Sequence, residues 1–310
     1  MMNALPRPRR IPVFVTTAFL VASLFSLVAC QPSESQPVQQ AAAVEVSALP
    51  GDTTAVAQFE ALMTEARAGG WHANDLGEIM TQVGLWFEGQ PYVAGSLDES
   101  AYEQLVIKLD GFDCVTFVES VLALSRTIEA EAYSYAGFVD HMQAQRYRDG
   151  KLDGYCSRLH YFSEWILDNE QRGRVRNVTQ EIGGVLLDKQ LNFMSGHRDS
   201  YAPLKDDSLY AGIVAMEANL QALQMYHIPQ AAIATTYPAL QGGDIVALAT
   251  DIGGLDVTHT GLVFKHENGQ AGLLHASTAR GVVVSPDLQA YVENNKRQIG
   301  IVIALSLIHI

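Results

Sequence analysis

One cysteine in this sequence stands where a thiol could be activated for catalysis. Cys114 directly follows Asp113 and precedes the most regular helical pattern of the chain, 115–128. Backbone N–H groups at the start of a helix stabilise a thiolate and lower the pKa of the thiol, and Asp113 can cap the helix. A free cysteine is also a common small buried residue, so position alone leaves both interpretations open.

Two histidines supply candidate partners for this thiol. A nucleophilic cysteine needs a base, and the base needs another group that orients it. His259 lies in DVTHTGLVF and His275 in GLLHAS, within two expected strands, 258–264 and 271–277. A single histidine on a strand is more often a structural group, but two on neighbouring strands after a helix-capping cysteine favour a catalytic pair.

The turn between these strands decides whether the two imidazoles share a face. A two-residue turn at Asn268-Gly269 would pair odd-numbered with even-numbered residues and place His259 and His275 on opposite faces. A three- or five-residue loop, or a bulge, would place both on one face. A catalytic pair therefore requires a three- or five-residue loop or a bulge between the strands.

Helical spacing of apolar residues, with stop signals such as Gly69-Gly70, predicts the elements that position these groups. The predicted helices cover 53–68, 76–87, 115–128, 135–146 and 161–169, and 89–98 is a predicted loop. Short strand-like runs bounded by glycines follow at 245–249, 260–264, 272–275 and 281–285. The stretch 170–240 gives no clear pattern. Helices followed by antiparallel strands predict an α+β domain with segregated elements.

The first thirty residues have the pattern of an export signal. Three arginines within residues 7–10 precede an apolar run over 11–28, and the segment LVAC places Cys30 directly after small residues. This segment resembles the lipobox of bacterial lipoproteins, in which Cys30 is lipidated and becomes the new N-terminus. An uncleaved anchor helix and a plain secretory signal are the alternatives. All three place the rest of the chain outside the cytoplasm.

These features divide the chain into four parts: a signal peptide (1–29), a flexible tether (30–52), one domain (53–304) and a tail (305–310). The tether is rich in Gln, Ser, Pro and Ala. The tail, LSLIHI, matches the translation of a common sequencing adapter. We therefore expect it to be non-native.

The composition excludes several classes of function. Twenty Lys+Arg against 34 Asp+Glu give a formal net charge of −14, with no basic block for nucleic acid. An acidic body is not drawn to anionic lipid, so the acyl chains of Cys30 would have to hold it at a membrane. Three cysteines are too few for a disulfide scaffold, and the other histidines are scattered without ligand spacing. We expect no metal and no cofactor, and we interpret Cys156 as a free thiol.

Several segments, in this order, resemble the extracytoplasmic, amidase-like branch of the NlpC-type papain-like cell-wall hydrolases. This is the N-acetylmuramoyl-L-alanine amidase-like family (domain of unknown function 1460). The segments are PYVAGSLD (91–98), FDCVTFVESVLALSR (112–126), RYRDG (146–150), SRLHYFSEWI (157–166), GGDIVAL (242–248), GLDVTHTGLVF (254–264) and LLHAS (273–277). The resemblance implies a papain-like fold in which the nucleophile helix packs on a C-terminal antiparallel sheet.

The resemblance also implies roles for individual residues. Cys114 matches the nucleophile, His259 the general base and His275 the group that orients the base. Candidates for the substrate cleft, each of which could instead serve packing or capping, are Tyr92, Asp98, Asp113, Arg158, His160 and Tyr161. An arginine can bind a substrate carboxylate bidentately. Two segments depart from the family pattern: GSLD replaces the more frequent Thr and Glu, and DCVTFV differs from the DCSG type of the peptidases.

These implications predict a lipid-anchored cysteine hydrolase that cleaves peptidoglycan fragments at the amide between the muramoyl lactyl group and L-alanine. The alternatives are a stem-peptide endopeptidase of the same fold and a non-catalytic envelope lipoprotein that binds wall fragments. We expect a monomer with a muropeptide substrate. Gln31 after Cys30, in place of Asp, predicts the outer membrane, facing the periplasm, by resemblance to the sorting rule of enteric bacteria.

Overall fold

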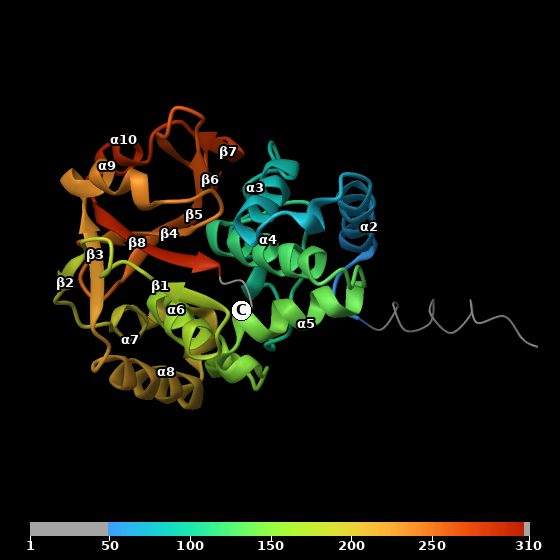
Figure 1. Ribbon diagram of the computed structural model, residues 1–310. Coiled ribbons are helices and arrows are strands. Elements are labelled where there is room, and N and C mark those ends of the chain that lie inside the picture. Colours follow the sequence, from blue (N-terminus) through green and yellow to red (C-terminus); the bar gives the residue numbers. More distant parts are fainter. Residues whose placement is uncertain (1–48, 307–310) are drawn as a thin grey trace, which may run out of the picture.

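The computed structural model describes residues 49–306 (Figure 1). The predicted signal, Cys30 and most of the predicted tether fall outside the described residues, as do residues 307–310 of the tail. Within 49–306, no helix has the length and apolar character needed to cross a membrane.

The first half of the described chain is a set of helices, and these begin and end close to the predicted positions. They are α2 (Thr53–Ala68), α3 (Leu76–Trp86), α4 (Cys114–Glu129), α5 (Tyr135–Arg146) and α6 (Phe162–Gln171). An aspartate caps each of α2, α3 and α4, because its side chain accepts a hydrogen bond from a backbone N–H of the first turn. The spacing of apolar residues and the N-cap residues are therefore sufficient to predict where these helices lie in the sequence.

An antiparallel sheet of eight strands packs against the helices. Its order is β2-β3-β8-β4-β5-β6-β7, and β1 also pairs with β8. The strands are β1 (Val175–Asn177), β2 (Val185–Leu187), β3 (Met225–Pro229), β4 (Ile245–Thr250), β5 (Val257–Lys265), β6 (Ala271–Ser277), β7 (Gly281–Ser285) and β8 (Gln298–Ser306). The four predicted strands correspond to β4–β7, and the α+β class is confirmed.

The remaining elements lie outside the predicted helices and strands. The stretch 170–240 contributes β1–β3 and the helices α7 (Phe193–Gly196), α8 (Asp207–Leu220) and α9 (Ile233–Thr236). The last helix, α10 (Leu288–Glu293), precedes β8. Although β8 is last in the chain, it lies inside the sheet, between β3 and β4. Its end, Leu305 and Ser306, pairs with β1, so this strand continues into the predicted tail, whose origin stays a prediction.

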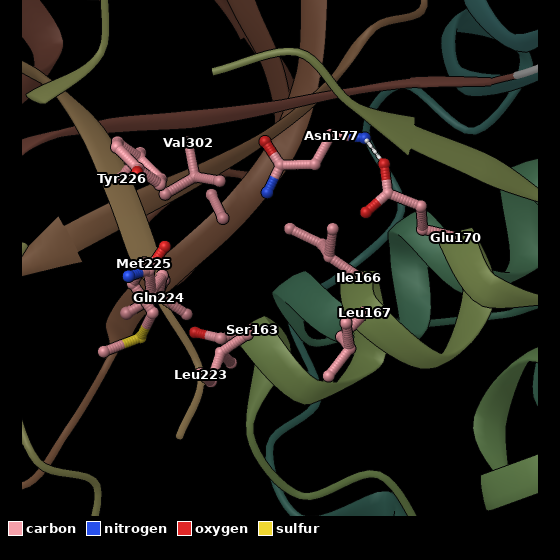
Figure 2. A pocket seen from close by; sticks show the side chains of 12 residues that line it. Ser163, Ile166, Leu167, Glu170, Asn177, Leu223, Gln224, Met225, Tyr226 and Val302 are labelled. Carbon is pink, nitrogen blue, oxygen red and sulfur yellow. Dashed lines mark hydrogen bonds between the residues drawn. The ribbon is translucent and has the colours of Figure 1, made fainter. Parts of the chain in front are cut away.

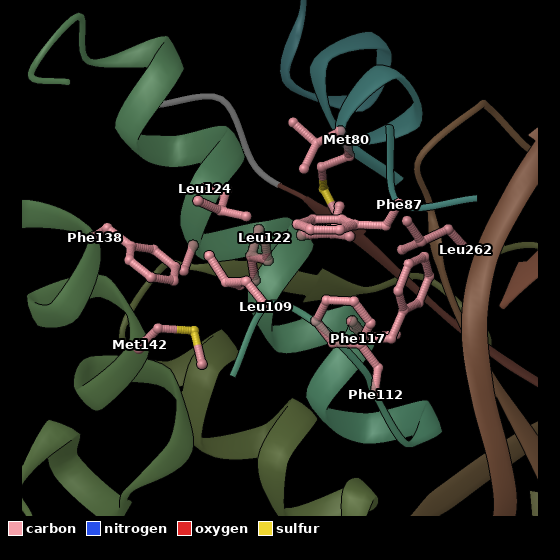
Figure 3. Close-up of a cluster of buried hydrophobic side chains, with 14 of the residues drawn as sticks. Met80, Phe87, Leu109, Phe112, Phe117, Leu122, Leu124, Phe138, Met142 and Leu262 are labelled. Carbon is pink, nitrogen blue, oxygen red and sulfur yellow. The ribbon is translucent and has the colours of Figure 1, made fainter. Parts of the chain in front are cut away.

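The sheet lies between the N-terminal helices and the helices α9 and α10 (Figure 1), and apolar side chains pack on both of its faces. The odd-numbered residues 245 and 247 of β4 face the N-terminal helices, and the even-numbered residues 246 and 248 face α9 and α10. On the first face, Leu262 of β5 lies beside a chain of edge-to-face aromatic rings (Figure 3), formed by Phe87, Phe112 and Phe117. This core holds α4 against β5 and β6.

The hairpin of β5 and β6 has the register that a catalytic pair requires. Leu262 pairs with Leu274 and Lys265 pairs with Ala271, so the numbers of paired residues have an even sum. The loop 266–270 joins the strands, and Gly269 adopts a positive φ of 85° within it. The longer of the possible loops is therefore present, and His259 and His275 lie on the same face of the sheet.

Candidate active site

Cys114 is the first residue of α4, and its neighbours fix the start of that helix. Asp113 Oδ1 accepts a hydrogen bond from Thr116 N (2.8 Å), and Thr116 Oγ1 accepts one from Asp113 N (2.9 Å). This reciprocal capping box satisfies two backbone donors at the helix start. Asp113 is thus a capping residue, and its contact with a substrate stays a prediction.

Thr260 connects the start of α4 to the strand that carries His259. Its buried hydroxyl donates a hydrogen bond to the main-chain oxygen of Cys114 (2.8 Å). The pairing of β5 with β6 ends at Leu262, so the preceding part of β5 has an open edge. The hydrogen bond to Cys114, together with the influence of Thr260 on the pKa of the thiol, indicates that Cys114 lies beside this part of β5, next to the residue that follows His259. The only sequence signal for Thr260 is its place beside that histidine.

The two predicted histidines are in direct contact. His259 Nε2 and His275 Nδ1 lie 2.7 Å apart, and the rings are nearly perpendicular. His275 is fully buried, and its Nε2 lies 3.1 Å from Ser285 Oγ. Gly261 is needed opposite His275, because a Cβ at this glycine would come within 2.9 Å of the His275 Cβ. No motif in the sequence indicates Ser285.

Burial keeps both the thiol and the imidazoles uncharged near neutral pH. Burial raises the pKa of the Cys114 thiol to about 11; the charge of Asp113 adds to the increase and the hydrogen bonds from Thr260 oppose it. Burial lowers the pKa of His259 to about 4. Burial, His259 and the charge of Arg280 lower the pKa of His275 to about 3. The prediction that the helix start lowers the thiol pKa is therefore wrong for the free protein, because burial outweighs the hydrogen bonds that favour the thiolate.

Two tyrosines share this site. The Tyr291 ring, on α10, has its centroid 4.8 Å from that of His275 and 6.0 Å from that of His259. Burial and the neighbouring Cys114 raise the pKa of the Tyr291 phenol. Burial, Cys114, Asp113 and Tyr291 raise the pKa of Tyr92 to about 12. Both phenols therefore lie within electrostatic reach of the sulfur; Tyr92 is a predicted site residue and Tyr291 is not.

A pocket of about 200 Å³ adjoins the start of α4. It is lined by five of the six predicted substrate-binding residues, namely Asp98, Asp113, Arg158, His160 and Tyr161. The loop before β5 adds Leu255, so the pocket lies close to the strand that carries His259. Asp98 of the predicted loop 89–98 is thus brought together with the residues selected from SRLHYF, whereas Tyr92 does not line this pocket.

Within this pocket, Arg158 is held by several protein groups. Its guanidinium lies 2.5 Å from Asp98 Oδ1 and 3.8 Å from Glu103 Oε2, and Nη1 donates to the main-chain oxygen of Leu97 (3.1 Å). Arg158 and Glu103 are almost completely buried, whereas Asp98 is 47% exposed. These contacts connect the loop 89–98 to the segment that precedes α6. Binding of a substrate carboxylate by Arg158 would compete with Asp98 and stays a prediction.

His160 and Tyr161 also make their hydrogen bonds inside the protein. His160 Nε2 lies 2.9 Å from the main-chain oxygen of Tyr155, and burial lowers the pKa of this histidine to about 3. The Tyr161 hydroxyl donates to Glu217 Oε1 (2.7 Å) and accepts from Met194 N (3.0 Å). Both residues hold the pocket wall in place, and their contact with a substrate stays a prediction.

A second pocket, of about 150 Å³, lies between α6 and the strands β3 and β8 (Figure 2). Ile166, Met225 and Val302 contribute to its apolar wall, and none of the predicted site residues lines it. Among residues 49–306, no three His, Cys, Asp or Glu residues are grouped to hold a metal ion. Cys156 is a free thiol, as predicted.

Comparison with solved structures shows close relatives of the whole domain. An N-acetylmuramoyl-L-alanine amidase from Bacteroides uniformis is 34% identical, with a TM-score of 0.72; the match covers 76% of this chain and 100% of that chain. A putative xylanase from Bacteroides fragilis is 35% identical, with a TM-score of 0.68, and the match covers 72% and 99%. A Legionella pneumophila protein shares the fold at 23% identity and a TM-score of 0.59, over 82% and 97%.

A comparison of the sequence with protein-family models assigns the chain to the same kind of protein. The model named AmiA-like, N-acetylmuramoyl-L-alanine amidase-like, matches residues 82–301, which include Cys114, His259 and His275. No curated protein matches the chain. The family model covers more than half of the chain, and the family that it names agrees with the amidase among the solved structures. The chain therefore belongs to the AmiA-like, N-acetylmuramoyl-L-alanine amidase-like family.

Proposed function

We propose that this chain is a lipid-anchored cysteine amidase that cleaves peptidoglycan fragments between the muramoyl lactyl group and L-alanine. The observation that carries the proposal is the 2.7 Å hydrogen bond between His259 and His275, on a strand whose next residue, Thr260, is bonded to Cys114. A thiol, an imidazole and a group that orients the imidazole are the parts of a cysteine hydrolase. Membership of the amidase-like family supports an amide in peptidoglycan as the target.

The reaction starts from a neutral thiol and a neutral imidazole, because their pKa values are about 11 and about 4. As the Cys114 sulfur attacks the amide carbonyl, a C–S bond forms and the thiol proton passes to His259. His259 gives this proton to the nitrogen of L-alanine as the C–N bond breaks. The stem peptide leaves with a free amine, and the lactyl group remains as a thioester. Water, deprotonated by His259, then converts the thioester to a carboxylate and restores the thiol.

His275 acts in this scheme through His259. His259 Nε2 and His275 Nδ1 are 2.7 Å apart, and the scheme assigns His259 Nε2 as the donor, so that the Nδ1 atom of His259 takes the thiol proton. Only a neutral His275 can accept this bond, and both its burial and the charge of Arg280 favour the neutral form. Asp113 already accepts the hydrogen bond of Thr116 N, so the backbone N–H groups of Cys114 and Val115 are the ones that can stabilise the oxyanion.

Digestion of purified muropeptides, followed by mass spectrometry, tests the proposed reaction. We expect the wild type to release an intact stem peptide with a free amine on L-alanine. Cys114→Ala should release none. Cys156→Ala is the matched control, because it removes a free thiol that lines a different pocket, beside α6 and α8, and it should retain the activity of the wild type.

Other products would change the assignment in defined ways. Cleavage between residues of the stem peptide would make the chain an endopeptidase of the same fold. A wild-type protein that binds muropeptides and cleaves none would be a non-catalytic envelope lipoprotein.

Attachment to the membrane is a separate part of the proposal and has its own test. The LVAC segment ending in Cys30 supports lipidation and, with Gln31, the outer membrane. In a Gram-negative host, the full chain should enter the detergent phase and sediment with outer membranes. Cys30→Ala should remain in the aqueous phase. A wild-type chain found in the aqueous phase would contradict the anchor without affecting the proposed chemistry.

A further inference from the structure

Tyr291 stands on a short helix that is firmly attached to the sheet. The N-cap of α10, Asp287, accepts hydrogen bonds from three groups: Ala290 N (2.6 Å), Tyr237 Oη (3.2 Å) and Gln270 Nε2 (2.6 Å). Leu288 and Val292 of this helix are buried in the core on the same side of the sheet. Residues 288, 291 and 292 lie on one side of a helix, so the Tyr291 side chain is directed toward the sheet.

The Tyr291 ring contacts both imidazoles. It meets His275 at 69° with a centroid distance of 4.8 Å, and it lies 30° from the plane of His259 at 6.0 Å. Among residues 49–306, no other aromatic side chain contacts both histidines. Tyr291 therefore covers the pair from the side opposite the sheet.

Few other charged or titratable groups face the imidazole pair. From the turn between β6 and β7, Arg280 Nη2 lies 3.4 Å from Ser285 Oγ, which in turn contacts His275. From α4, Cys114 lies within electrostatic reach of the Tyr291 phenol. Tyr291 is thus in contact with both imidazoles and close to the sulfur, which lies on a different element.

We propose that Tyr291 is a positioning residue whose ring excludes water from the His259–His275 pair and holds both imidazoles in place for Cys114. This inference rests on the proposed function of the two histidines. Water stabilises an imidazolium ion, so a ring that excludes water favours the neutral imidazole, the form that can accept a proton from the thiol. Burial is the cause of the lowered pKa of His259, in agreement with such a cover.

A titration of the histidine side chains by NMR tests the proposal without any substrate. In Tyr291→Ala, water reaches the imidazoles, so the pKa of His259 should rise from about 4 toward the ordinary value of about 6.5. Tyr291→Phe keeps the ring and should leave the titration unchanged. His160, which is buried beside the Tyr155 ring, is the internal control and should titrate as in the wild type in both variants.

Activity on muropeptides gives a second readout. In Tyr291→Ala, the acid limb of the pH profile of kcat/KM should move to higher pH, and kcat should fall about tenfold at neutral pH. Tyr291→Phe should remain within about threefold of the wild type. If Tyr291→Ala does not fold, Tyr291→Leu serves in its place, because a smaller apolar side chain fits the same site and covers the imidazoles incompletely.

Two outcomes would overturn the proposal. In the first, the histidine titration of a folded Tyr291→Ala or Tyr291→Leu is the same as in the wild type. In the second, Tyr291→Phe is as impaired as Tyr291→Ala, which would assign the effect to the hydroxyl rather than to the ring. A wild-type protein without hydrolase activity would contradict the proposed function and leave the NMR result to be judged separately.

Discussion

The imidazole pair and the Arg158 pocket both hold buried polar side chains in contact, but they differ in how many of the polar atoms are bonded to other protein groups. In the pocket, Arg158 is paired with Asp98 and Glu103, and the side chain of His160 is bonded to the main chain. In the pair, the hydrogen bond between the two imidazoles uses Nε2 of His259, so its Nδ1 can serve as the proposed proton acceptor. A sequence motif thus indicates where a site lies, but the hydrogen bonds and ion pairs of each side chain show which of its polar atoms are still available to a substrate.

The largest effect that we expect separates two buried histidines. His259→Ala should reduce kcat by about 10³-fold or more, because it removes the proposed base. His160→Ala should reduce kcat far less, because its Nε2 is bonded to the main chain, and should lower the free energy of unfolding by about 1–3 kcal/mol. Steady-state kinetics and urea unfolding of both variants check this contrast. Equal losses of kcat would remove the distinction between the two regions.

The reactivity of Cys114 with iodoacetamide measures how much thiolate the free protein contains. With a thiol pKa of about 11, the thiolate form is favoured only above that pH. The alkylation rate should therefore rise about tenfold for each pH unit, or about 10³-fold from pH 7 to pH 10. The Cys114 and Cys156 peptides are followed together by mass spectrometry. A rate that is already constant above pH 7 would mean that the helix start stabilises the thiolate after all.

Arg158 gives a stability test of the pocket. Arg158→Ala leaves the buried Glu103 carboxylate without its cationic partner, so the free energy of unfolding should fall by about 3–5 kcal/mol. Asp98→Asn is the matched change at the exposed partner of Arg158. It should lower the free energy of unfolding by less than about 1 kcal/mol, because Glu103 still pairs with Arg158. Urea denaturation measures both values. A fully stable Arg158→Ala with a greatly increased KM would instead make Arg158 a substrate-binding residue.

The smallest effect that we expect concerns Ser285. Ser285→Ala removes the hydroxyl next to His275 Nε2, so this imidazole is oriented less well and kcat should fall about tenfold or less. Ser285→Thr retains the hydroxyl and should recover most of the activity. Steady-state kinetics at a single pH is sufficient. An unchanged kcat in Ser285→Ala would show that His259 alone fixes the orientation of His275.

The helical half of the fold could be predicted because its signals are local. The apolar spacing and N-cap residues of 53–171 lie within each helix, so a single sequence contains them. The strands β1–β3 and β8 could not be predicted in the same way. β1 and β2 have three residues each, and β8 pairs with partners from distant parts of the chain, so their place depends on tertiary contacts.

By itself, the sequence determined the start of α4 at Cys114, the two strands that carry histidines, and the family to which these segments are similar. Only the tertiary structure decided that the loop 266–270 sets an even register, so that the imidazoles meet. It also buried the thiol, which raises its pKa, and brought Thr260, Ser285 and Tyr291 next to Cys114 and the imidazoles. The physical reason is that desolvation and side-chain contacts arise between elements far apart in the chain, where no local pattern records them.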